Sequence, residues 1–222
     1  MTSSLEAIPR KSLKDTVVQR ICEAIERGEL KAGEPVTELG LARKLGVGQP
    51  TIREALLELQ FIGFVEQVGA RKTRVTQLTR RMIDEIYLVR TCLEILAAEI
   101  VARQKNPDLR ACWEQVERME EAARVQAHSE FFHADLEFHR ALWRTAGNQS
   151  LESALERLVP KLFAFGIIQH ARLAVDVLIA TANLHRQLLE LIRTGNVDAT
   201  RRMMETSMGK AWVDDALLPE LG

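Results

Sequence analysis

Hydrophobic residues recur at helical spacing in the first part of the chain. Four of them lie three or four positions apart and predict a helix over residues 12–27, which Gly28 ends: Leu13, Val17, Ile21 and Ile25. The same spacing returns over residues 39–45. Thr37 is expected as the N-cap of this second helix, because its hydroxyl can accept a free backbone N–H, and Val36 is expected to enter the helix with it. These segments predict two helices before residue 46.

Two glycines then separate the second helix from a third. Gly46 and Gly48 suit a tight corner, because only glycine adopts positive φ without steric cost. Pro50 falls in the first turn of the next helix, where its missing N–H is harmless, and Gly63 ends that helix. The buried stripe expected in this third helix consists of Ile52, Ala55, Leu56, Leu59 and Ile62.

The residues that follow are β-prone rather than helical. Residues 64–68 and 73–76 predict two strands, joined through Gly69-Ala70-Arg71-Lys72 into a hairpin whose tip carries two adjacent cations. Helix, turn, helix and hairpin in this order form a winged helix-turn-helix. Such a unit can lay its second helix in a DNA major groove and its wing on the neighbouring backbone or minor groove.

Everything after residue 77 is helix-periodic, with no credible strand. Thr79 and Asp108 are expected to cap the first two helices, and Pro160 is expected to kink the fourth. The predicted helices cover residues 79–104, 108 onward, 129–146, 150–172, 175–194 and 198–217. The pattern therefore predicts a mainly α protein, with a winged helix-turn-helix and its β-hairpin over residues 1–77 and an antiparallel bundle of six to seven helices over residues 78–222.

Composition narrows the class of protein. The chain is 46% hydrophobic, yet it has no uninterrupted apolar run near twenty residues and no secretory leader pattern, so we expect no membrane span and a cytoplasmic location. Three cysteines without CxxC spacing argue against a disulfide framework or a zinc ribbon. The net charge of −1 is unevenly divided: residues 1–76 carry 12 Lys and Arg against 10 Asp and Glu, whereas the remainder carries 18 against 21. The sign of this asymmetry fits a DNA-binding N-terminal part.

The motif LARKLGV followed by TIREALLELQFIGFVE resembles the winged-helix signature of the GntR superfamily, with REAL as its most recognisable core. The resemblance implies a bacterial transcription factor whose hold on DNA changes when a metabolite binds a C-terminal domain. Polar positions at the start and on the outer side of the third helix, a cation near the corner and the wing tip are the expected DNA contacts: Arg43, Gln49, Thr51, Arg53, Arg71 and Lys72. Arg53 could instead form an ion pair within the chain, with Glu54 or Glu58.

The chain departs from the family in two places. Where the family usually has Ser-Arg-Thr-Pro, this chain has Gly48-Gln49-Pro50-Thr51, so a glutamine stands where a DNA-reading arginine is common. Glutamine favours adenine over guanine, so the operator is expected to differ there. In the wing, the usual Arg-Gly pair is replaced by Arg71 and Lys72.

The second half resembles the FadR-like branch, with its all-helical FCD effector domain, in DLEFHRALWRTAGN, LVRTCLE and HRQLLELIRTGNVDA. Asp135 and His139 lie four positions apart, on one helical face, and are either half of a divalent-metal site or an ordinary i,i+4 pair. The family site takes two further histidines: His185 matches the first, and Ser207 stands at the second. The resemblance thus implies zinc, nickel or manganese on Asp135, His139 and His185.

Arg90 matches the family's inward-facing arginine, which implies a clamp for a small organic acid, with Ser207 also lining that site. Its alternative is an ion pair with Glu94, one turn later. Together these features predict a homodimeric repressor that binds a palindromic operator on double-stranded DNA and responds to an organic-acid effector. A metal-dependent enzyme using the same Asp/His/His cluster is the alternative function. No HExxH, GxSxG or Gly-rich phosphate loop supports it.

Overall fold

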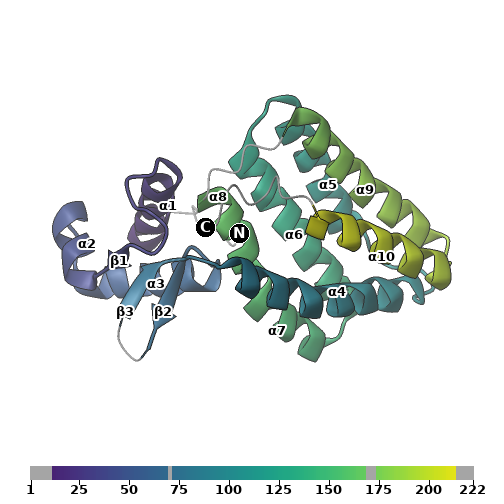
Figure 1. The fold of residues 1–222 in the computed structure, drawn as a ribbon, viewed down its shortest axis with the longest axis horizontal. Helices are drawn as coiled ribbons and strands as arrows, with labels where there is room; N and C mark the ends of the chain where they lie inside the picture. The colour runs from purple at the N-terminus through teal and green to yellow at the C-terminus, as the bar shows by residue number, and fades with distance from the viewer. Residues whose placement is uncertain (1–11, 70–71, 169–173, 214–222) are drawn as a thin grey trace, which may run out of the picture. The chain divides into compact units, whose positions relative to one another are not determined.

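A computed structural model describes residues 12–69, 72–168 and 174–213, with side chains up to residue 208. The chain divides into two compact units, one ending at Val75 and the other beginning at Thr76. The first unit contains a small sheet, and the second is helical throughout its described residues (Figure 1). The fold is thus mainly α, as the sequence predicts.

The first unit follows the order helix, strand, helix, helix, strand, strand. Its elements are α1 (Leu13–Glu26), β1 (Pro35–Val36), α2 (Glu38–Leu45), α3 (Gln49–Phe61), β2 (Val65–Val68) and β3 (Lys72–Val75). The three strands form an antiparallel sheet in the order β1-β3-β2, in which Val36 lies opposite Thr73 and Val65 opposite Val75. The expected winged helix-turn-helix is therefore present, with one strand more than the hairpin alone.

That additional strand corrects the expectation for Val36. Thr37 is the N-cap of α2, and its hydroxyl accepts the N–H of Gly40 at 3.1 Å. An N-cap residue has extended backbone angles, here φ −119° and ψ 143°, so the residue before it continues a strand more readily than a helix. Val36 accordingly lies in β1, and its side chain is buried.

The corner between α2 and α3 depends on a left-handed residue. Gly46 is the C-cap of α2 with φ +67°. Replacing Gly46 with alanine is expected to destabilise the protein by about 1 kcal/mol, because a Cβ is unfavourable in this conformation. A Cβ built there contacts no atom within 4 Å, so backbone strain is the whole cost. Urea denaturation measures the loss. Gly46→Asn should lose less, because asparagine tolerates left-handed angles, and an equal loss in both variants would contradict this explanation.

The second unit is a helical bundle in which helices distant in the sequence also pack together, such as α4 with α10 and α5 with α9. Its helices are α4 (Arg80–Ala102), α5 (Arg110–Arg124), α6 (His128–Ala146), α7 (Gln149–Leu158), α8 (Pro160–Ile168), α9 (Val175–Arg193) and α10 (Val197–Val213). Thr79 caps α4 as expected, accepting the N–H of Met82. The N-cap of α5 is Leu109 and not Asp108; the Asp108 carboxylate still accepts the Arg110 N–H at 3.2 Å.

Pro160 breaks the predicted fourth helix into α7 and α8 instead of only kinking it. Proline has no N–H to donate to the preceding turn, and it is favourable as the first residue of a helix, which is its position in α8. Residues 169–172 of that prediction, and residues 214–217 of the predicted last helix, lie outside the described residues.

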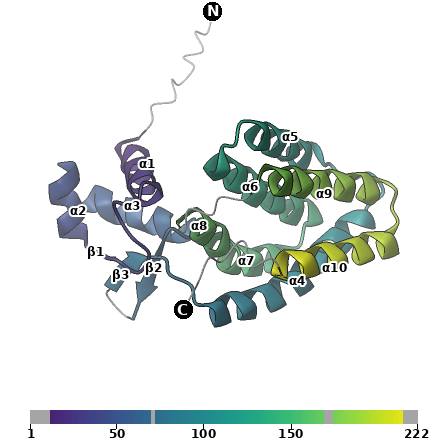
Figure 2. The same cartoon turned by 45° about the horizontal axis from the view of Figure 1, so that its top comes forward.

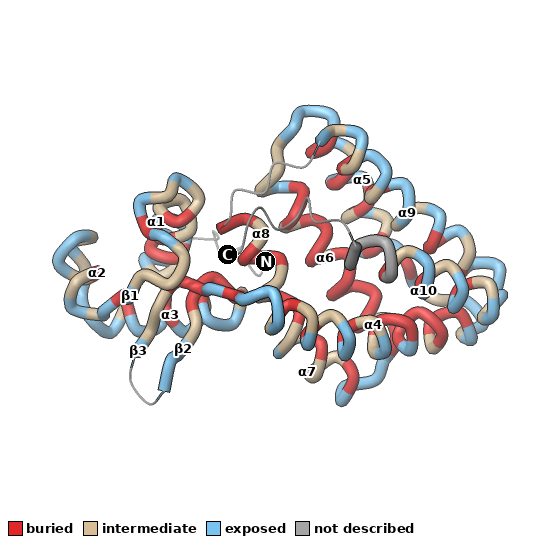
Figure 3. The backbone as a smooth tube through the Cα atoms, viewed as in Figure 1, coloured by how far each residue is buried: buried red, intermediate tan, exposed pale blue. Residues whose placement is uncertain are grey.

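Helix α6 forms the centre of the bundle and packs against α4, α5 and α8 (Figures 1 and 2). Its large apolar side chains are almost fully buried: Phe131, Phe138, Leu142 and Trp143. Figure 3 shows α6 buried over most of its length, whereas the outer turns of α5 and α9 are exposed. No helix among the described residues is long and apolar enough to cross a membrane.

The buried stripe of α4 leaves out one of its large apolar side chains. Leu96 is 41% exposed. The stripe at three- and four-residue spacing runs instead through Ile86, Arg90, Glu94 and Ala97, all buried. Two charged side chains therefore occupy the centre of an apolar helix face, where burial is costly unless each charge has a partner.

Candidate functional site

The exposed face of α3 carries the side chains expected to read DNA. Gln49 and Arg53 are exposed and Thr51 is half-buried, while Ile52 and Ala55 on the opposite side are completely buried. Apolar residues anchor the helix to its unit and leave the polar ones accessible.

The other expected DNA contacts lie on α2 and β3. Arg43 in the last turn of α2 and Lys72 at the start of β3 are exposed. Arg71, the other predicted wing cation, lies outside the described residues.

Arg53 forms an ion pair within the chain, with a partner that the sequence did not suggest. Its Nε and Nη2 donate to the two carboxylate oxygens of Glu38 at 2.9 and 2.8 Å. The sequence offered Glu54 or Glu58 as the alternative partner, but Glu58 pairs with Lys14 on α1. Glu38 begins α2, fifteen residues away, so the corner between the helices creates the contact. The Arg53 side chain remains 64% exposed, and so the guanidinium is oriented without being removed from the surface.

Three potential metal ligands converge inside the bundle. Asp135 and His139 lie one turn apart on α6, and His185 approaches from α9. One ligand atom from each lies within 4.8 Å of the others. The Nε2 atom of His185 is 3.1 Å from Asp135 Oδ1, and that of His139 is 3.5 Å from the same oxygen. The fold thus brings together the two residues that share a helix face and the one that comes from a distant segment.

The hydrogen bonds of the two Nδ1 atoms determine the tautomer of each histidine. His185 Nδ1 donates to the backbone carbonyl of Thr181 at 2.8 Å, and His139 Nδ1 donates to the Glu94 carboxylate at 3.0 Å. Both of these partners are acceptors only, so in each neutral ring the proton sits on Nδ1 and the lone pair on Nε2. Both lone pairs therefore sit on Nε2, the ring nitrogen nearer to Asp135, which is the tautomer that metal-ligating histidines require here.

Asp135 Oδ1 lacks a hydrogen bond in this arrangement. The oxygen is buried, and neither histidine contact has hydrogen-bond geometry. Burial alone would raise the pKa of Asp135, but His185, His139 and Arg90 together outweigh burial and lower that pKa. Burial alone would lower the pKa of His185, but Asp135, the Thr181 carbonyl and Glu94 together raise it. A buried carboxylate oxygen is repelled by two nearby imidazole lone pairs unless a proton or a cation lies between them. The residues present therefore fit a divalent metal.

Arg90 is buried beside this cluster and forms the ion pair with Glu94 that the sequence left open, while its role as a clamp for an organic acid stays a prediction. Its Nε donates to Glu94 Oε1 at 3.2 Å, one turn along α4, and its Nη2 donates to His139 Nε2 at 2.9 Å. The guanidinium carbon lies 5.4 Å from the centre of the Tyr87 ring and 5.1 Å from that of Phe163. The side chain is thus an ion-pair partner and a direct neighbour of the candidate metal ligands.

Glu94 is a residue of this site that the sequence suggested only as a partner for Arg90. It is completely buried, and its carboxylate accepts from Arg90, from His139 Nδ1 and from Trp143 Nε1 at 3.1 Å. Burial by itself would raise the pKa of Glu94; the charges of His139 and Arg90 and the hydrogen bonds from His139 and Trp143 outweigh it and lower that pKa to about 2. A carboxylate within an otherwise apolar stripe was the signal that could have identified it.

Ser207 lies on α10 and is half-buried. Within the described part of the chain, no hydrogen bond joins it to Asp135, His139 or His185. The position that the family resemblance fills with a histidine therefore contributes no visible ligand contact.

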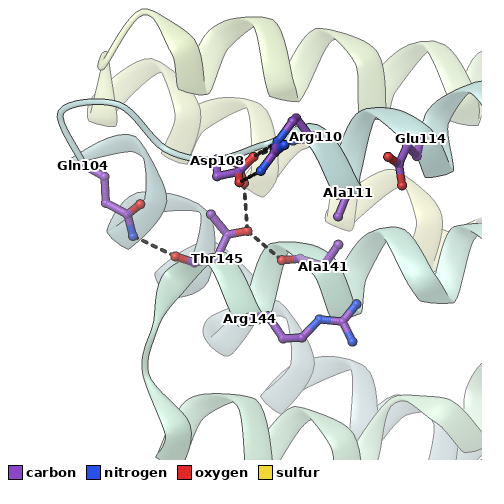
Figure 4. A pocket seen from close by; sticks show the side chains of 8 residues that line it. All are labelled: Gln104, Asp108, Arg110, Ala111, Glu114, Ala141, Arg144 and Thr145. Carbon is purple, nitrogen blue, oxygen red and sulfur yellow. Dashed lines mark hydrogen bonds and ion pairs between the residues drawn. The ribbon is translucent and has the colours of Figure 1, made fainter. Parts of the chain in front are cut away.

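A separate pocket of about 530 Å³ opens near the ends of α4 and α6 and the start of α5 (Figure 4). It is lined by Gln104, Asp108, Arg110, Ala111, Glu114, Ala141, Arg144 and Thr145. Several of its polar groups bond to one another: Arg110 pairs with Asp108 at 2.7 Å, and Thr145 donates to the Ala141 carbonyl at 2.8 Å. None of the expected site residues lines it, so the buried cluster remains the better candidate site.

Two family models match the chain. The model described as "Bacterial regulatory proteins, gntR family" matches residues 13–75, and the FCD domain model matches residues 85–209. A probable D-xylose utilization operon transcriptional repressor of Paenarthrobacter nicotinovorans is 28% identical over 196 residues, which cover 88% of this chain and 85% of that protein.

Solved structures share the fold. A putative GntR transcriptional regulator from Rhodococcus sp. RHA1 aligns with a TM-score of 0.72 at 19% identity, over 93% of this chain and 99% of its own. McbR/YncC of Escherichia coli aligns with a TM-score of 0.69 at 22% identity, over 90% of this chain and 95% of its own. Both likenesses extend over the winged helix-turn-helix and the helical bundle.

Proposed function

Since the chain belongs to the GntR family of bacterial regulatory proteins and carries an FCD domain, we propose that it is a homodimeric repressor whose operator binding responds to an organic acid held near a divalent metal. Membership in this family makes the protein a transcriptional regulator, and the alternative of a metal-dependent enzyme has no support. The description of the Paenarthrobacter relative as a repressor favours repression over activation.

The convergence of Asp135, His139 and His185 beside Arg90 carries the proposal for the second unit. One carboxylate oxygen and two imidazole nitrogens are a donor set suited to zinc, nickel or manganese, and the bound ion supplies a Lewis-acidic centre for a carboxylate. Arg90 contributes guanidinium donors on the adjacent helix, which suit the same carboxylate. Ser207 would line the effector site with a neutral hydroxyl in place of an imidazole.

The exposed polar face of α3 supports the proposal for the first unit. Gln49, Thr51 and Arg53 would contact base edges in the major groove, while Arg43 and the wing residues Arg71 and Lys72 would contact the backbone or minor groove. In a two-fold dimer, the two recognition helices meet equivalent half-sites, so the operator is palindromic. The effector acts by binding more tightly to one spacing of these helices than to the other.

Selection of DNA fragments from random sequence by the purified full-length chain tests this function. We expect the selected fragments to share a palindrome. Elemental analysis of the purified protein should detect one divalent metal ion per chain, and adding metal back to chelator-treated protein should change its affinity for the operator. Retention of fragments without sequence preference would contradict the regulator. Selective retention that is indifferent to metal would contradict only the metal-linked response.

An apolar stripe on α4 supports a second copy of this chain as the dimer partner. Leu88 is 72% exposed, and Cys92 and Leu96 follow it at intervals of one turn on the same face. Glu85 and Arg103 are exposed near opposite ends of the stripe and differ in sign. An antiparallel pairing of two α4 helices would cover the leucines and bring Glu85 of one copy toward Arg103 of the other.

Replacing Leu88 with glutamate is expected to raise the dimer dissociation constant at least about tenfold, because each copy loses an apolar contact worth roughly 1.5–3 kcal/mol and places a charge there. Sedimentation equilibrium measures the change. Leu184→Glu on α9 is the matched control, since Leu184 is also an exposed leucine, at 38%. An equal effect in both variants, or none in Leu88→Glu, would place the dimer contact elsewhere.

A further inference from the structure

We infer that Arg90 is the resident cation of the Asp135–His139–His185 cluster, and that a divalent metal binds only when the guanidinium leaves His139 Nε2. This inference rests on the metal site proposed above and adds a competitor to it. Two cations then compete for the site: the Arg90 guanidinium of the chain and a metal ion from solution.

The first step concerns a single lone pair. His139 Nδ1 carries the ring proton because it donates to Glu94, so the only lone pair in the ring plane is on Nε2. Arg90 Nη2 donates to that atom at 2.9 Å, a full hydrogen-bond contact. One imidazole lone pair cannot accept a guanidinium N–H and ligate a metal together. The two contacts are therefore mutually exclusive at His139.

The second step concerns charge. Arg90 and Glu94 are both buried, and Asp135 is the other buried carboxylate beside His139. With Arg90 in contact, this interior already contains a cation among its acids. A divalent ion at the cluster would place like charges close together in a poorly screening interior. Metal entry is therefore coupled to movement of the guanidinium away from His139.

The third step concerns where the guanidinium can go. Its Nε is held by Glu94 on its own helix, and the rings of Tyr87 and Phe163 lie near its carbon. Because the guanidinium is a rigid plane, it must tilt as a whole about the contact of Nε with Glu94 for its Nη atoms to leave His139. Once released, those donors are free for another acceptor, such as a carboxylate on the metal. The exchange thus orders binding, with the metal first and the acid second.

Metal affinity of an Arg90→Met variant tests the exchange. The apparent metal affinity equals the intrinsic affinity multiplied by the fraction of molecules in which Arg90 has left His139. If this fraction is below about one in ten, removing the guanidinium tightens metal binding at least tenfold. Full-length protein, Zn²⁺ alone and a chromophoric chelator in competition give the dissociation constants at one fixed pH.

Arg140→Met is the matched control. Arg140 is the residue after His139 and also a largely buried arginine, but its guanidinium pairs with Glu156 and Glu137. Arg140→Met also removes one positive charge, from the residue next to His139 on α6, and its zinc affinity should stay within a few fold of the wild type. Tighter binding in Arg90→Met alone supports the exchange. Equal or weaker binding in Arg90→Met overturns it, as does equal tightening in both variants. Failure of both wild type and Arg90→Met to bind zinc overturns the metal site itself.

A crystal structure of the wild-type protein soaked with Zn²⁺ decides the question where Arg90→Met fails to fold. We expect Zn²⁺ on His139 Nε2 and the Arg90 Nη atoms beyond hydrogen-bond distance of that nitrogen. Zn²⁺ at the cluster with the Arg90–His139 contact intact would overturn the inference while leaving the proposed metal site standing.

Discussion

Replacing Arg53 with alanine is expected to lower the affinity of the dimer for its operator by about 30-fold or more. A specific base contact from an arginine contributes roughly 1–3 kcal/mol, which is about fivefold or more per half-site, and a two-fold dimer loses it twice. The Arg53 side chain is 64% exposed and oriented by Glu38, so it can meet DNA without a change in the fold of α3. Fluorescence anisotropy with the selected operator measures the loss.

Two variants separate base reading from general charge. Arg20→Ala removes a cation of nearly equal exposure, 65%, from α1, and it should weaken operator and random DNA by a similar, smaller factor. Glu38→Gln releases Arg53 from its ion pair and should preserve or increase operator affinity. Full operator affinity in Arg53→Ala would show that α3 is not the reading helix.

The helices of this protein were predictable because the features that specify them lie in neighbouring residues. Periodic apolar residues, the caps Thr37 and Thr79, and the glycine corner require only neighbouring residues. The two caps and the corner appear in the structure as expected, whereas Leu13 of the first stripe is exposed and Ile62 lies just beyond α3. Some errors are local, such as the Asp108 cap and the break at Pro160, but one occurs where a distant segment decides the outcome. Val36 becomes a strand because β3 is available to pair with it, and no local feature of the sequence encodes that pairing.

The candidate site was predictable to a smaller extent. Spacing alone places Asp135 and His139 on one face of a helix, but only the fold, or a family resemblance, brings His185 from α9 to the same point. The importance of Glu94 was obscured because an i,i+4 pair with Arg90 looks like an ordinary surface ion pair in the sequence. The pair is buried in the structure, and the Glu94 carboxylate also orients His139 and accepts the Trp143 N–H.

The buried position of Glu94 leads to the second large effect. Glu94→Gln is expected to destabilise the metal-free protein by about 3–5 kcal/mol, because it leaves Arg90 buried without its direct anionic partner. The substitution preserves the size of the side chain, so the loss reports charge and hydrogen bonding more than packing. Denaturant titration at pH 7 in the presence of a chelator measures it. Glu121→Gln is the control, since Glu121 pairs with Arg124 on the surface and should change stability by no more than about 0.5 kcal/mol.

The pH dependence of stability supplies an independent check of the same carboxylate. The pKa of Glu94 is about 2 in the folded protein and near 4.5 when unfolded. Its contribution is therefore present above pH 4.5 and is lost as the pH falls toward 2, a difference of about 3 kcal/mol. Asp135, whose pKa is also lowered, loses stability in the same direction, so the informative quantity is the difference between wild type and Glu94→Gln. That difference should shrink between pH 4.5 and pH 2. A gap that stays constant down to pH 2 would mean that Glu94 acts through packing, and its role in orienting His139 would then have no electrostatic basis.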